Sequence, residues 1–301
     1  MKIIKNNKIK KNFKRSVVAI GNFDGLHKGH KKVLKEAKEK AKKNKLPFGI
    51  VTFEPVPVMF FNKKIKHHRI NNLNQKISEF QKLKVDFLNI IKFDKKFSNL
   101  SYIKFIREIL YKKLNCKFIF ISKNFRFGKN RQGNIYNLER NGKFYNYKTI
   151  ISKPLKRKSK VLSSSIIRSE ISKGNISNVN SLLGRNWTIE GKVIKGNKRG
   201  RKIGFRTCNI KLAGYVVPKL GVYSVTVLVN NIKKKGIANV GYRPTFNGKI
   251  LLLEVNIFGL KENLYNKNLK VSFVKFIRPE KKFKDIRELK NQIKKDIKRV
   301  K

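Results

Sequence analysis

The stretch that decides the fold covers residues 17–30 and reads VVAIGNFDGLHKGH. Its first four residues are apolar and mostly β-branched, which is typical of a buried strand. A glycine-rich turn follows, and His27 and His30 then open a lysine-rich, helix-favouring segment over residues 31–43. This order predicts a strand, a tight turn and a helix whose free N–H groups and partial positive charge suit a phosphate. Two imidazoles at that helix start can reach the oxygens of a nucleoside triphosphate.

The His-x-Gly-His pattern has a second interpretation when it is considered alone. In that interpretation one histidine caps the helix and the other is an ordinary surface residue. The residues around the pattern favour phosphate chemistry. A buried-type strand precedes it, Gly21, Gly25 and Gly29 space it, and a helix follows.

Length and composition restrict the class of protein. A chain of 301 residues predicts about two domains, each long enough to bury its own core. No apolar run approaches the ~20 residues that a membrane span needs, and residues 1–5 lead into no apolar signal-peptide core. Cys116 and Cys208 are too few and too scattered for a disulfide framework or a zinc site. We therefore expect a reduced, cytoplasmic protein.

The net charge is unusual, because 75 Lys and Arg residues stand against 17 Asp and Glu residues, giving +58. Such a field attracts nucleic acids and anionic surfaces. The alternative is a coding bias, since Lys, Asn, Ile and Phe have AT-rich codons and all are abundant here. The lysines are spread along the whole chain, and the aromatic residues form no base-stacking signature. We expect no specific nucleic-acid or membrane partner, and a monomer or weak homo-oligomer whose charge helps to recruit polyanionic substrates.

The first half alternates apolar runs with helix-like stretches. Strands are predicted at residues 17–23, 48–53, 87–93 and 118–122, and helices at 29–43, 73–83 and 99–114. This alternation predicts a parallel sheet with helices on both faces and ligands at the carboxyl ends of the strands, where His27 and His30 lie. The remainder is expected to contain a loop-rich segment (123–142), a strand (145–152), a basic linker (153–160) and helices at 164–172 and 175–183.

The second half has a different character. Strand-like runs recur at residues 188–194, 223–230, 236–240, 250–257 and 269–276, with Gly, Asn or Pro between them. This pattern predicts an antiparallel sandwich or small barrel. A charged amphipathic helix over residues 285–299 closes the chain. Its apolar residues Ile286, Leu289, Ile293 and Ile297 are expected to pack on the barrel. A boundary near Gly184 divides the chain into domains 1–184 and 185–301.

Three further motifs point to chemistry. Residues 124–128 read NFRFG just after the fourth predicted strand, and residues 163–168 read SSSIIR at a helix start. Hydroxyl groups and free N–H groups with an Arg one turn later make a second phosphate site. Residues 191–209 read GKVIKGNKRGRKIGFRTCN, a basic loop with glycines four residues apart that lets backbone N–H groups approach phosphates. Taken alone, each motif is better explained by an ordinary structural role, which is a turn for NFRFG, a helix cap for SSSIIR and a flexible hairpin for the basic loop.

Together the motifs resemble those of the bacterial bifunctional riboflavin kinase/FAD synthetases. GNFDGLHKGH, NFRFG and SSSIIR match the adenylyltransferase half in order and spacing, and the basic loop is similar to the flavokinase pattern GxxxGRxxGFPTAN. Further matches are GVY (221–223), NVG (239–241), RPTF (243–246), LEV (253–255) and LY (264–265), so the resemblance covers nearly the whole chain. It implies an α/β nucleotidyltransferase-type, Rossmann-like domain with a parallel sheet, followed by an antiparallel β-barrel riboflavin kinase domain with a C-terminal helix. The implied reactions phosphorylate riboflavin to FMN and adenylylate FMN to FAD, using ATP and Mg²⁺.

The resemblance also implies residue roles in the transferase half. His27 and His30 would act on the ATP phosphates and the developing charge, and Asn124 would place the flavin substrate. The other residues that it assigns to ATP or its phosphates are Gly21, Phe23, Asp24, Gly25, Gly29, Ser164, Ser165 and Arg168.

In the kinase half, Glu254 stands out because a carboxylate inside the apolar run 251–255 is costly unless it is paired or functional. A salt bridge to a lysine and a solvent-facing position are the alternatives to function. The resemblance makes Glu254 the base that deprotonates the ribityl 5′-hydroxyl. It also implies flavin binding by Arg243, metal binding by Thr207 and Asn209, and phosphate binding by Gly196, Gly200 and Gly204.

The chain departs from the family pattern at several positions. Arg206 and Cys208 replace the Pro and Ala of PTAN, and since proline fixes backbone shape, Arg206 is expected to loosen the metal-binding turn. Asn197, Tyr242 and Val161 stand where an acidic residue, a small residue and an Arg are usual. Two alternatives to the bifunctional enzyme stay open: an enzyme that keeps one activity and has lost the other, and a nucleic-acid-binding protein that reuses the fold.

Overall fold

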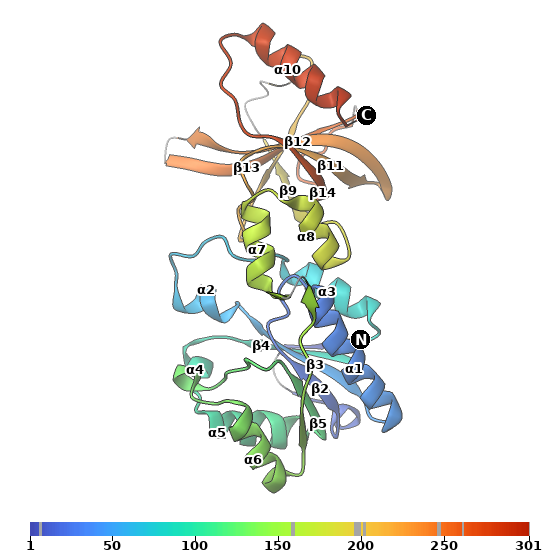
Figure 1. Cartoon of the computed structure of the whole chain (residues 1–301), viewed down its shortest axis with the longest axis vertical. Helices are drawn as coiled ribbons and strands as arrows, with labels where there is room; N and C mark the ends of the chain where they lie inside the picture. Colours follow the sequence, from blue (N-terminus) through green and yellow to red (C-terminus); the bar gives the residue numbers. More distant parts are fainter. Residues whose placement is uncertain are drawn as a thin grey trace. The chain divides into compact units, whose positions relative to one another are not determined.

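The computed structural model describes residues 1–5, 8–157, 160–195, 200, 203–245, 248–260 and 262–300. They form two compact units (Figure 1). The first contains Met1–Ile65 and Leu73–Ser163, and the second contains Lys66–Asn72 and Ser164–Lys301. By packing, the second unit therefore includes the two helices that follow Ser163. The predicted boundary near Gly184 concerns sequence domains and stays a prediction.

The first unit is built on a six-stranded sheet with the order β1-β4-β3-β2-β5-β6, and each neighbouring pair is parallel. Its strands are β1 (Lys2–Ile4), β2 (Val17–Ile20), β3 (Phe48–Glu54), β4 (Phe87–Lys92), β5 (Phe118–Ile121) and β6 (Lys148–Ile151). From β2 the chain proceeds outward through β3 to β4, then returns to pair β5 with the other side of β2. The switch point of this topology therefore lies between the carboxyl ends of β2 and β5, where open α/β sheets bind ligands.

Helices cover both faces of this sheet. Alternate residues of β2 point to opposite sides and enter two separate buried clusters. Val17 and Ala19 belong to one buried cluster, with side chains of α1 (Lys28–Lys43) and α3 (Leu73–Lys82). Val18 and Ile20 belong to the other, with side chains of the π-helix η2 (Phe105–Lys113) and of α6 (Ile135–Tyr145). The remaining short helices of the unit are α2 (Pro57–Phe61), α4 (Lys95–Ser98), α5 (Tyr102–Lys104) and the 3₁₀ turns η1 (Lys11–Phe13) and η3 (Lys129–Arg131).

Some sequence expectations for this unit are wrong. The segment expected to be loop-rich contains most of α6 (Ile135–Tyr145), which begins at a capping box between Asn134 and Asn137. Its asparagines and Gly142 resemble loop composition, yet Gly142 is needed because a Cβ there would lie 2.6 Å from the Tyr147 carbonyl oxygen. The predicted helix at 99–114, by contrast, is confirmed: α5 is followed directly by the π-helix η2, Phe105–Lys113.

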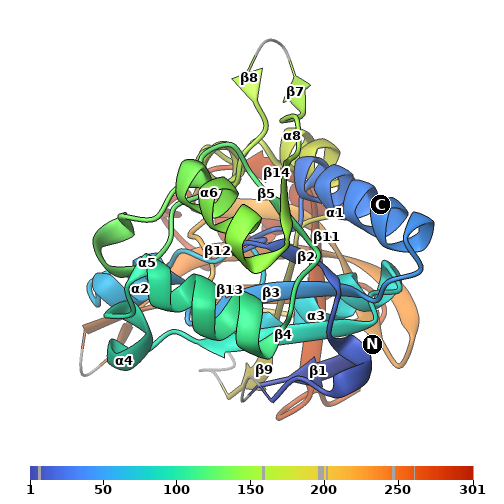
Figure 2. The same cartoon turned by 90° about the horizontal axis from the view of Figure 1, so that it is seen from below.

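The segment expected to be a plain basic linker instead carries a paired strand ribbon. β7 (Lys156–Arg157) and β8 (Lys160–Val161) run antiparallel to each other (Figure 2). Val161, which stands where the family usually has an Arg, is 46% exposed on this ribbon.

The second unit is a closed antiparallel barrel with the strand order β10-β13-β12-β11-β14-β9, and β9 pairs with β10. The strands are β9 (Thr188–Ile194), β10 (Cys208–Lys211), β11 (Gly221–Val229), β12 (Ile232–Thr245), β13 (Gly248–Ile257) and β14 (Asn268–Arg278). The barrel rather than the sandwich is thus the correct alternative, and β10 is a strand that sequence reasoning missed. α7 (Ser164–Ser172) and α8 (Ile176–Leu183) precede the barrel.

The C-terminal helix α10 (Ile286–Lys298) is present as expected, but its anchor is polar. Asp296 is 1% exposed and accepts hydrogen bonds from the Arg278 guanidinium at 2.8–3.1 Å. Leu289, Ile293 and Ile297 are half-buried. Ile286, which was expected to pack on the barrel, is 62% exposed because it occupies the first turn of the helix.

Replacing Asp296 with Ala is expected to destabilise the second unit by about 3 kcal/mol, because it leaves a half-buried guanidinium without its carboxylate. Urea unfolding followed by circular dichroism measures this change. Lys281→Met is the matched control, since it removes the exposed ion pair between Lys281 and Glu288 of the same helix region. Its cost is expected to stay below about 1 kcal/mol. Equal effects of the two variants would contradict the anchoring role of Asp296.

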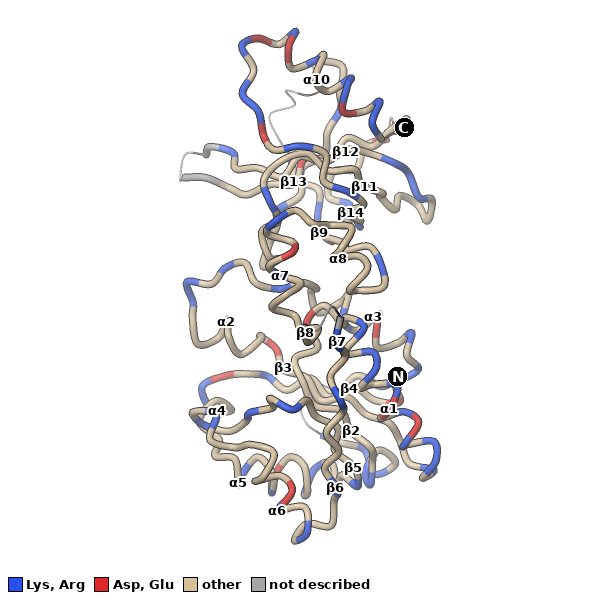
Figure 3. Tube along the Cα trace, in the orientation of Figure 1, with Lys and Arg blue, Asp and Glu red and all other residues tan. Residues whose placement is uncertain are grey.

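Basic residues occur along both units instead of gathering in one segment (Figure 3). None of the described helices has the length and apolar character that crossing a bilayer requires.

Candidate active sites

The turn after β2 is held in an unusual backbone conformation. The Gly21 N–H donates to the Val51 carbonyl oxygen at 3.1 Å, and the Leu26 N–H donates to that of Phe23 at 3.2 Å. Phe23 and Leu26 have φ angles of +47° and +41°, which non-glycine residues adopt infrequently. Both side chains are buried, so packing stabilises a conformation that the local sequence disfavours.

His27 and His30 lie together at the start of α1. His27 is 3% exposed, and its Nδ1 accepts the His30 backbone N–H at 3.3 Å as the helix N-cap. The two imidazole rings stack with centroids 3.7 Å apart. A Cβ at position 29 would lie 3.1 Å from two His27 ring atoms, so only a glycine leaves that ring in place. The capping interpretation of the motif is therefore correct for one histidine, while the surface interpretation is wrong for the other.

His30 is held as a neutral imidazole. Burial, the neighbouring His27 and the ammonium of Lys76, in that order, hold its pKa well below the usual range. Its Nδ1 is buried and has no hydrogen-bond partner among the described residues. A buried ring nitrogen of this kind favours a ligand that supplies the missing partner.

The helix α3 supports this turn from the side. The Lys76 ammonium donates to the Asn22 carbonyl oxygen at 3.4 Å, and the Thr52 hydroxyl donates to the same oxygen at 3.3 Å. Phe80, one turn after Lys76, packs edge-on against Phe23 with ring centroids 5.9 Å apart. Sequence reasoning assigned these residues to a helix only. The signal was a lysine on the apolar face of an amphipathic segment.

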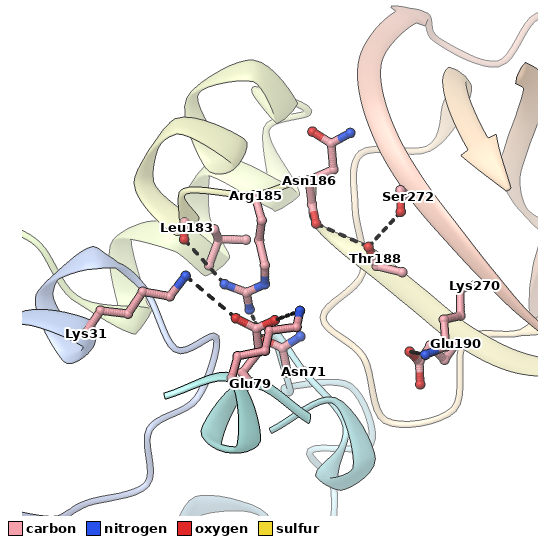
Figure 4. Close-up of polar contacts among 11 residues, drawn as sticks. Lys31, Asn71, Glu79, Leu183, Arg185, Asn186, Thr188, Glu190, Lys270 and Ser272 are labelled. Atoms are coloured by element: carbon pink, nitrogen blue, oxygen red, sulfur yellow. Dashed lines mark hydrogen bonds and ion pairs between the residues drawn. The ribbon is translucent and has the colours of Figure 1, made fainter. Parts of the chain in front are cut away.

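An ion pair joins α1 and α3 close to the motif. The Lys31 ammonium lies 3.6 Å from the Glu79 carboxylate (Figure 4). Figure 4 also shows the Arg185 guanidinium donating to the Asn71 amide oxygen at 2.9 Å, a contact that lies wholly within the second unit. The Trp187 indole N–H donates to the Ile70 carbonyl oxygen at 2.9 Å. These two bonds attach the segment Lys66–Asn72 to the barrel unit.

Asn124 is exposed just after β5, so it follows the strand on the other side of the switch point from the histidine turn. A continuous row of aromatic rings begins beside it. Successive ring centroids lie 5.3–6.1 Å apart along Phe125, Phe127, Phe105, Phe97, Phe93 and Phe61. Phe61, on α2, is 68% exposed. Sequence reasoning missed this aromatic row because its members come from five separate segments.

The serine cluster and Arg168 lie on α7 in the second unit. Ser164 is the first residue of the helix, and Arg168 follows one turn later on the same face. Ser165 is exposed, while Ser164 and Arg168 are half-buried. The buried face of this helix is formed by Ile167 and Ile171. The polar face is therefore the one that can receive a phosphate.

The barrel brings three polar side chains into one row. Glu254 on β13 is directly opposite Asn209 on β10 and directly opposite Asn239 on β12. Their neighbours Leu253 and Val255 are at most 1% exposed, so they fill the barrel interior. Because side chains alternate along a strand, the three polar residues lie on the outer face of the barrel.

Glu254 is paired with Arg243, not with a lysine. The Arg243 Nε and Nη2 donate to the two Glu254 carboxylate oxygens, each at 2.9 Å. This bidentate contact raises the pKa of Arg243. Glu280 lies 4.0 Å from the same guanidinium and accepts a hydrogen bond from the Asn239 amide at 3.2 Å. The structure therefore places Arg243 as an orienting partner of the carboxylate.

The turn that carries Thr207 and Asn209 offers hard oxygen donors. The Asn209 Oδ1 atom is buried and has no hydrogen-bond partner among the described residues, while Thr207 is exposed. The Asn256 amide donates to the Arg206 carbonyl oxygen at 2.6 Å, which anchors this turn without a proline. Burial raises the pKa of the Cys208 thiol to about 11, so it stays protonated at neutral pH. Hydroxyl, amide and carboxylate oxygens are the ligands that Mg²⁺ prefers, and these residues fit it.

No cluster of three His, Cys, Asp or Glu side chains suited to a metal occurs within the described ranges.

Gly200 and Gly204 of the basic loop meet different structural requirements for glycine. Gly196 lies outside the described residues. Gly200 accepts the Phe205 N–H at 2.8 Å, and a Cβ on it would lie 2.4 Å from the Phe205 carbonyl oxygen and 3.2 Å from the Thr207 hydroxyl. Gly204 has φ = +88°, a region that favours glycine.

Replacing Gly200 with Ala is expected to impair riboflavin phosphorylation by about 100-fold, because the added methyl displaces the turn that holds Thr207. FAD formation from supplied FMN should be unchanged and is the internal control. Separation of the flavins by chromatography measures both rates. A variant with an unaltered kinase rate would show that this close approach has no role in phosphate or metal binding.

Comparison with known proteins agrees with this architecture. The family model described as FAD synthetase matches residues 9–166, and the one described as riboflavin kinase matches residues 183–301. A bifunctional riboflavin kinase/FMN adenylyltransferase from Buchnera aphidicola (subsp. Schizaphis graminum) is 42% identical, covering 100% of this chain and 98% of the relative. The enzyme of the same description from Escherichia coli K12 is 35% identical over 93% of this chain and 90% of the relative.

A crystal structure described as a macrolide-efflux protein from Streptococcus pneumoniae shares the fold, with a TM-score of 0.87, 29% identity and coverage of 100% of this chain and 99% of that one.

A parallel nucleotidyltransferase-like sheet and a closed barrel with an aligned carboxylate define a two-part transferase. The chain belongs to the family of bifunctional riboflavin kinases/FMN adenylyltransferases. It is an enzyme of flavin cofactor biosynthesis with a kinase activity that leads to FMN and an adenylyltransferase activity that leads to FAD.

Proposed function

We propose that Glu254 is the base of the kinase reaction and that His27 and His30 serve the adenylyl transfer, with ATP as the donor in both. The observation that carries this proposal is that each of the two family signatures contains its own group of polar side chains. One is the stacked histidine pair at a helix start, and the other is the carboxylate aligned with Asn209 and Asn239.

In the kinase reaction, the ribityl 5′-hydroxyl of riboflavin attacks the γ-phosphorus of ATP, and ADP leaves. Glu254 accepts the proton of that hydroxyl, and the bidentate Arg243 holds the carboxylate in one orientation. The family pattern also suggests that Arg243 binds the flavin, and the same guanidinium would make that contact.

Thr207 and Asn209 would hold Mg²⁺ in this proposal. Two observations support it: the buried Asn209 oxygen has no hydrogen-bond partner among the described residues, and the Glu254 carboxylate is directly opposite Asn209 in the strand pairing. When bound, the ion supplies charge neutralisation at the phosphate oxygens. Gly200 and Gly204 shape the loop beside Thr207, and with Gly196 they offer backbone N–H groups to the phosphates.

In the adenylyl transfer, an FMN phosphate oxygen attacks the α-phosphorus of ATP in line, and pyrophosphate leaves. Such a reaction needs positioning and charge stabilisation more than covalent chemistry. The turn from Gly21 to Gly29 and the two imidazoles would hold the ATP phosphates. A polyphosphate beside His30 favours its protonated form, so the ring can gain charge when the ligand binds. Ser164, Ser165 and Arg168 would receive the β- and γ-phosphates.

The flavin ring of FMN would lie along the aromatic row that ends at Phe61, with Asn124 at its other end. An exposed phenylalanine continuous with buried rings offers a flat apolar surface for a planar aromatic ligand.

We further propose a monomer or weak homo-oligomer with no specific nucleic-acid partner. The dispersed basic residues support this, because dedicated binders concentrate their positive charge. Sedimentation at several protein concentrations and RNA binding at several salt concentrations test these two points.

The proposed function is tested by incubating the purified protein with riboflavin, ATP and Mg²⁺ and separating the flavins by chromatography. FMN is expected first and FAD later, and neither without Mg²⁺. Folded protein that forms only one product would favour an enzyme that has lost one activity. Tight, steeply salt-dependent RNA binding with no flavin turnover would favour the nucleic-acid-binding hypothesis.

A further inference from the structure

Lys76 differs from the other basic residues that the structure describes on the helices of the first unit. Its side chain is 2% exposed, among the largest fully buried side chains, whereas Lys82 on the same helix has a side chain that is 68% exposed. Lysine is almost never fully buried without a partner, because removing an ammonium from water is costly. A chain with so many surface lysines has no need of this one for solubility.

The contacts of Lys76 point to the histidine turn. Its ammonium donates to the Asn22 carbonyl oxygen at 3.4 Å and lies 3.9 Å from the Glu54 carboxylate at the end of β3. Asn22 follows β2 directly and begins the turn that leads to His27. The contact with Asn22 therefore ties the buried ammonium to the first residue of the histidine turn.

We infer that Lys76 is a positioning residue for adenylyl transfer, which fixes the turn carrying His27 and His30 and places a positive charge behind the imidazole pair. The inference rests on the proposed assignment of these histidines to the ATP phosphates. Phe80 acts from the same face of α3, through Phe23, whose ring contacts that of His30.

The electrostatics agree with the geometry. The charged and titratable groups that act on His30 are His27 from its own helix start and Lys76 from α3, and Glu54 on β3 faces Lys76 itself. Lys76 is thus the group on a second element that lowers the pKa of His30. A positive charge at this position also adds to the field that favours a polyphosphate.

The test compares Lys76→Met with Lys82→Met. Methionine fills a similar volume without charge, and Lys82 is an exposed lysine on the same helix. With FMN and ATP supplied, Lys76→Met is expected to lower kcat for FAD formation about 100-fold, while riboflavin phosphorylation and the Lys82→Met enzyme match the wild type.

A second readout separates positioning from a merely structural role. The pKa of His30 is followed through its Cε1–H NMR signal, assigned with a His30→Asn variant. Lys76→Met should raise this pKa toward the ordinary value near 6.5, and Lys82→Met should leave it unchanged. If Lys76→Met does not fold, Lys76→Gln replaces it, since the amide can still donate to Asn22 but carries no charge. The pKa of His30 should rise in that variant too.

An unchanged rate of FAD formation, or an unchanged His30 pKa in a folded Lys76 variant, would overturn the inference. A His27→Asn enzyme in the same assays shows which idea has failed. Normal FAD formation by that enzyme would reject the histidine assignment itself, whereas its loss beside an active Lys76→Met enzyme rejects only the role of Lys76.

Discussion

A Glu254→Gln enzyme is expected to lose riboflavin phosphorylation while it still converts supplied FMN to FAD. The amide has the size of the carboxylate but cannot accept the proton of the 5′-hydroxyl, and it gives up the charged pair with Arg243. Loss of a general base lowers rates by about 100- to 10,000-fold. Chromatographic separation of riboflavin, FMN and FAD after incubation with ATP and Mg²⁺ measures both steps on one sample.

Glu190→Gln is the matched control for this variant. Glu190 is also a half-buried barrel carboxylate with a basic partner, since the Lys270 ammonium lies 3.3 Å from it (Figure 4). Its replacement should leave both rates intact. If Glu254→Gln retains the kinase rate, or if both variants lose it equally, Glu254 is not the base. Its pairing with Arg243 then serves the stability of the barrel.

A His27→Asn enzyme should show the reverse pattern, with FAD formation reduced about 100- to 1,000-fold and FMN formation intact. Asparagine is a good N-cap residue, so the start of α1 keeps a side-chain oxygen for the His30 N–H. What disappears is the imidazole that stacks on His30 and lies 3% exposed in the turn. The rate of FAD formation from FMN and ATP, measured against the kinase rate of the same preparation, gives the effect.

Lys28→Ala serves as the control for the helix start, because Lys28 is the exposed first residue of α1. Its FAD formation should equal that of the wild type. Should the His27→Asn enzyme keep its FAD formation, the phosphate assignment of the histidine turn would have to be abandoned, whatever the result for Glu254.

Much of the fold was predictable because its signals are local. The apolar β-branched runs that became β2 to β5 and the turn residues between the barrel strands act over a few positions each. The errors occurred where local composition opposed the packing. α6 looks like a loop because it is rich in Asn and ends near a glycine, and Ile286 looks like a core residue because it follows the helical period.

The features of the candidate sites fall into the same two groups, those with a local sequence signal and those that depend on packing. The motifs around His27, Asn124, Ser164 and Glu254 are contiguous strings, so the sequence alone indicated both reactions. The aromatic row to Phe61 and the contact of Lys76 with Asn22 join segments distant in sequence, so no local pattern predicts which residues they bring together.

By itself, then, the sequence determined that this protein has a phosphate-binding strand–turn–helix, a second β-rich half and a carboxylate set in an apolar strand. Only the tertiary structure decided that this carboxylate pairs with Arg243 and aligns with Asn209, and that a lysine of α3 stands behind the histidine turn. The physical reason is that period and propensity are properties of neighbouring residues. Burial, charge pairing and the pKa of His30 depend on which distant segments the folded chain brings into contact.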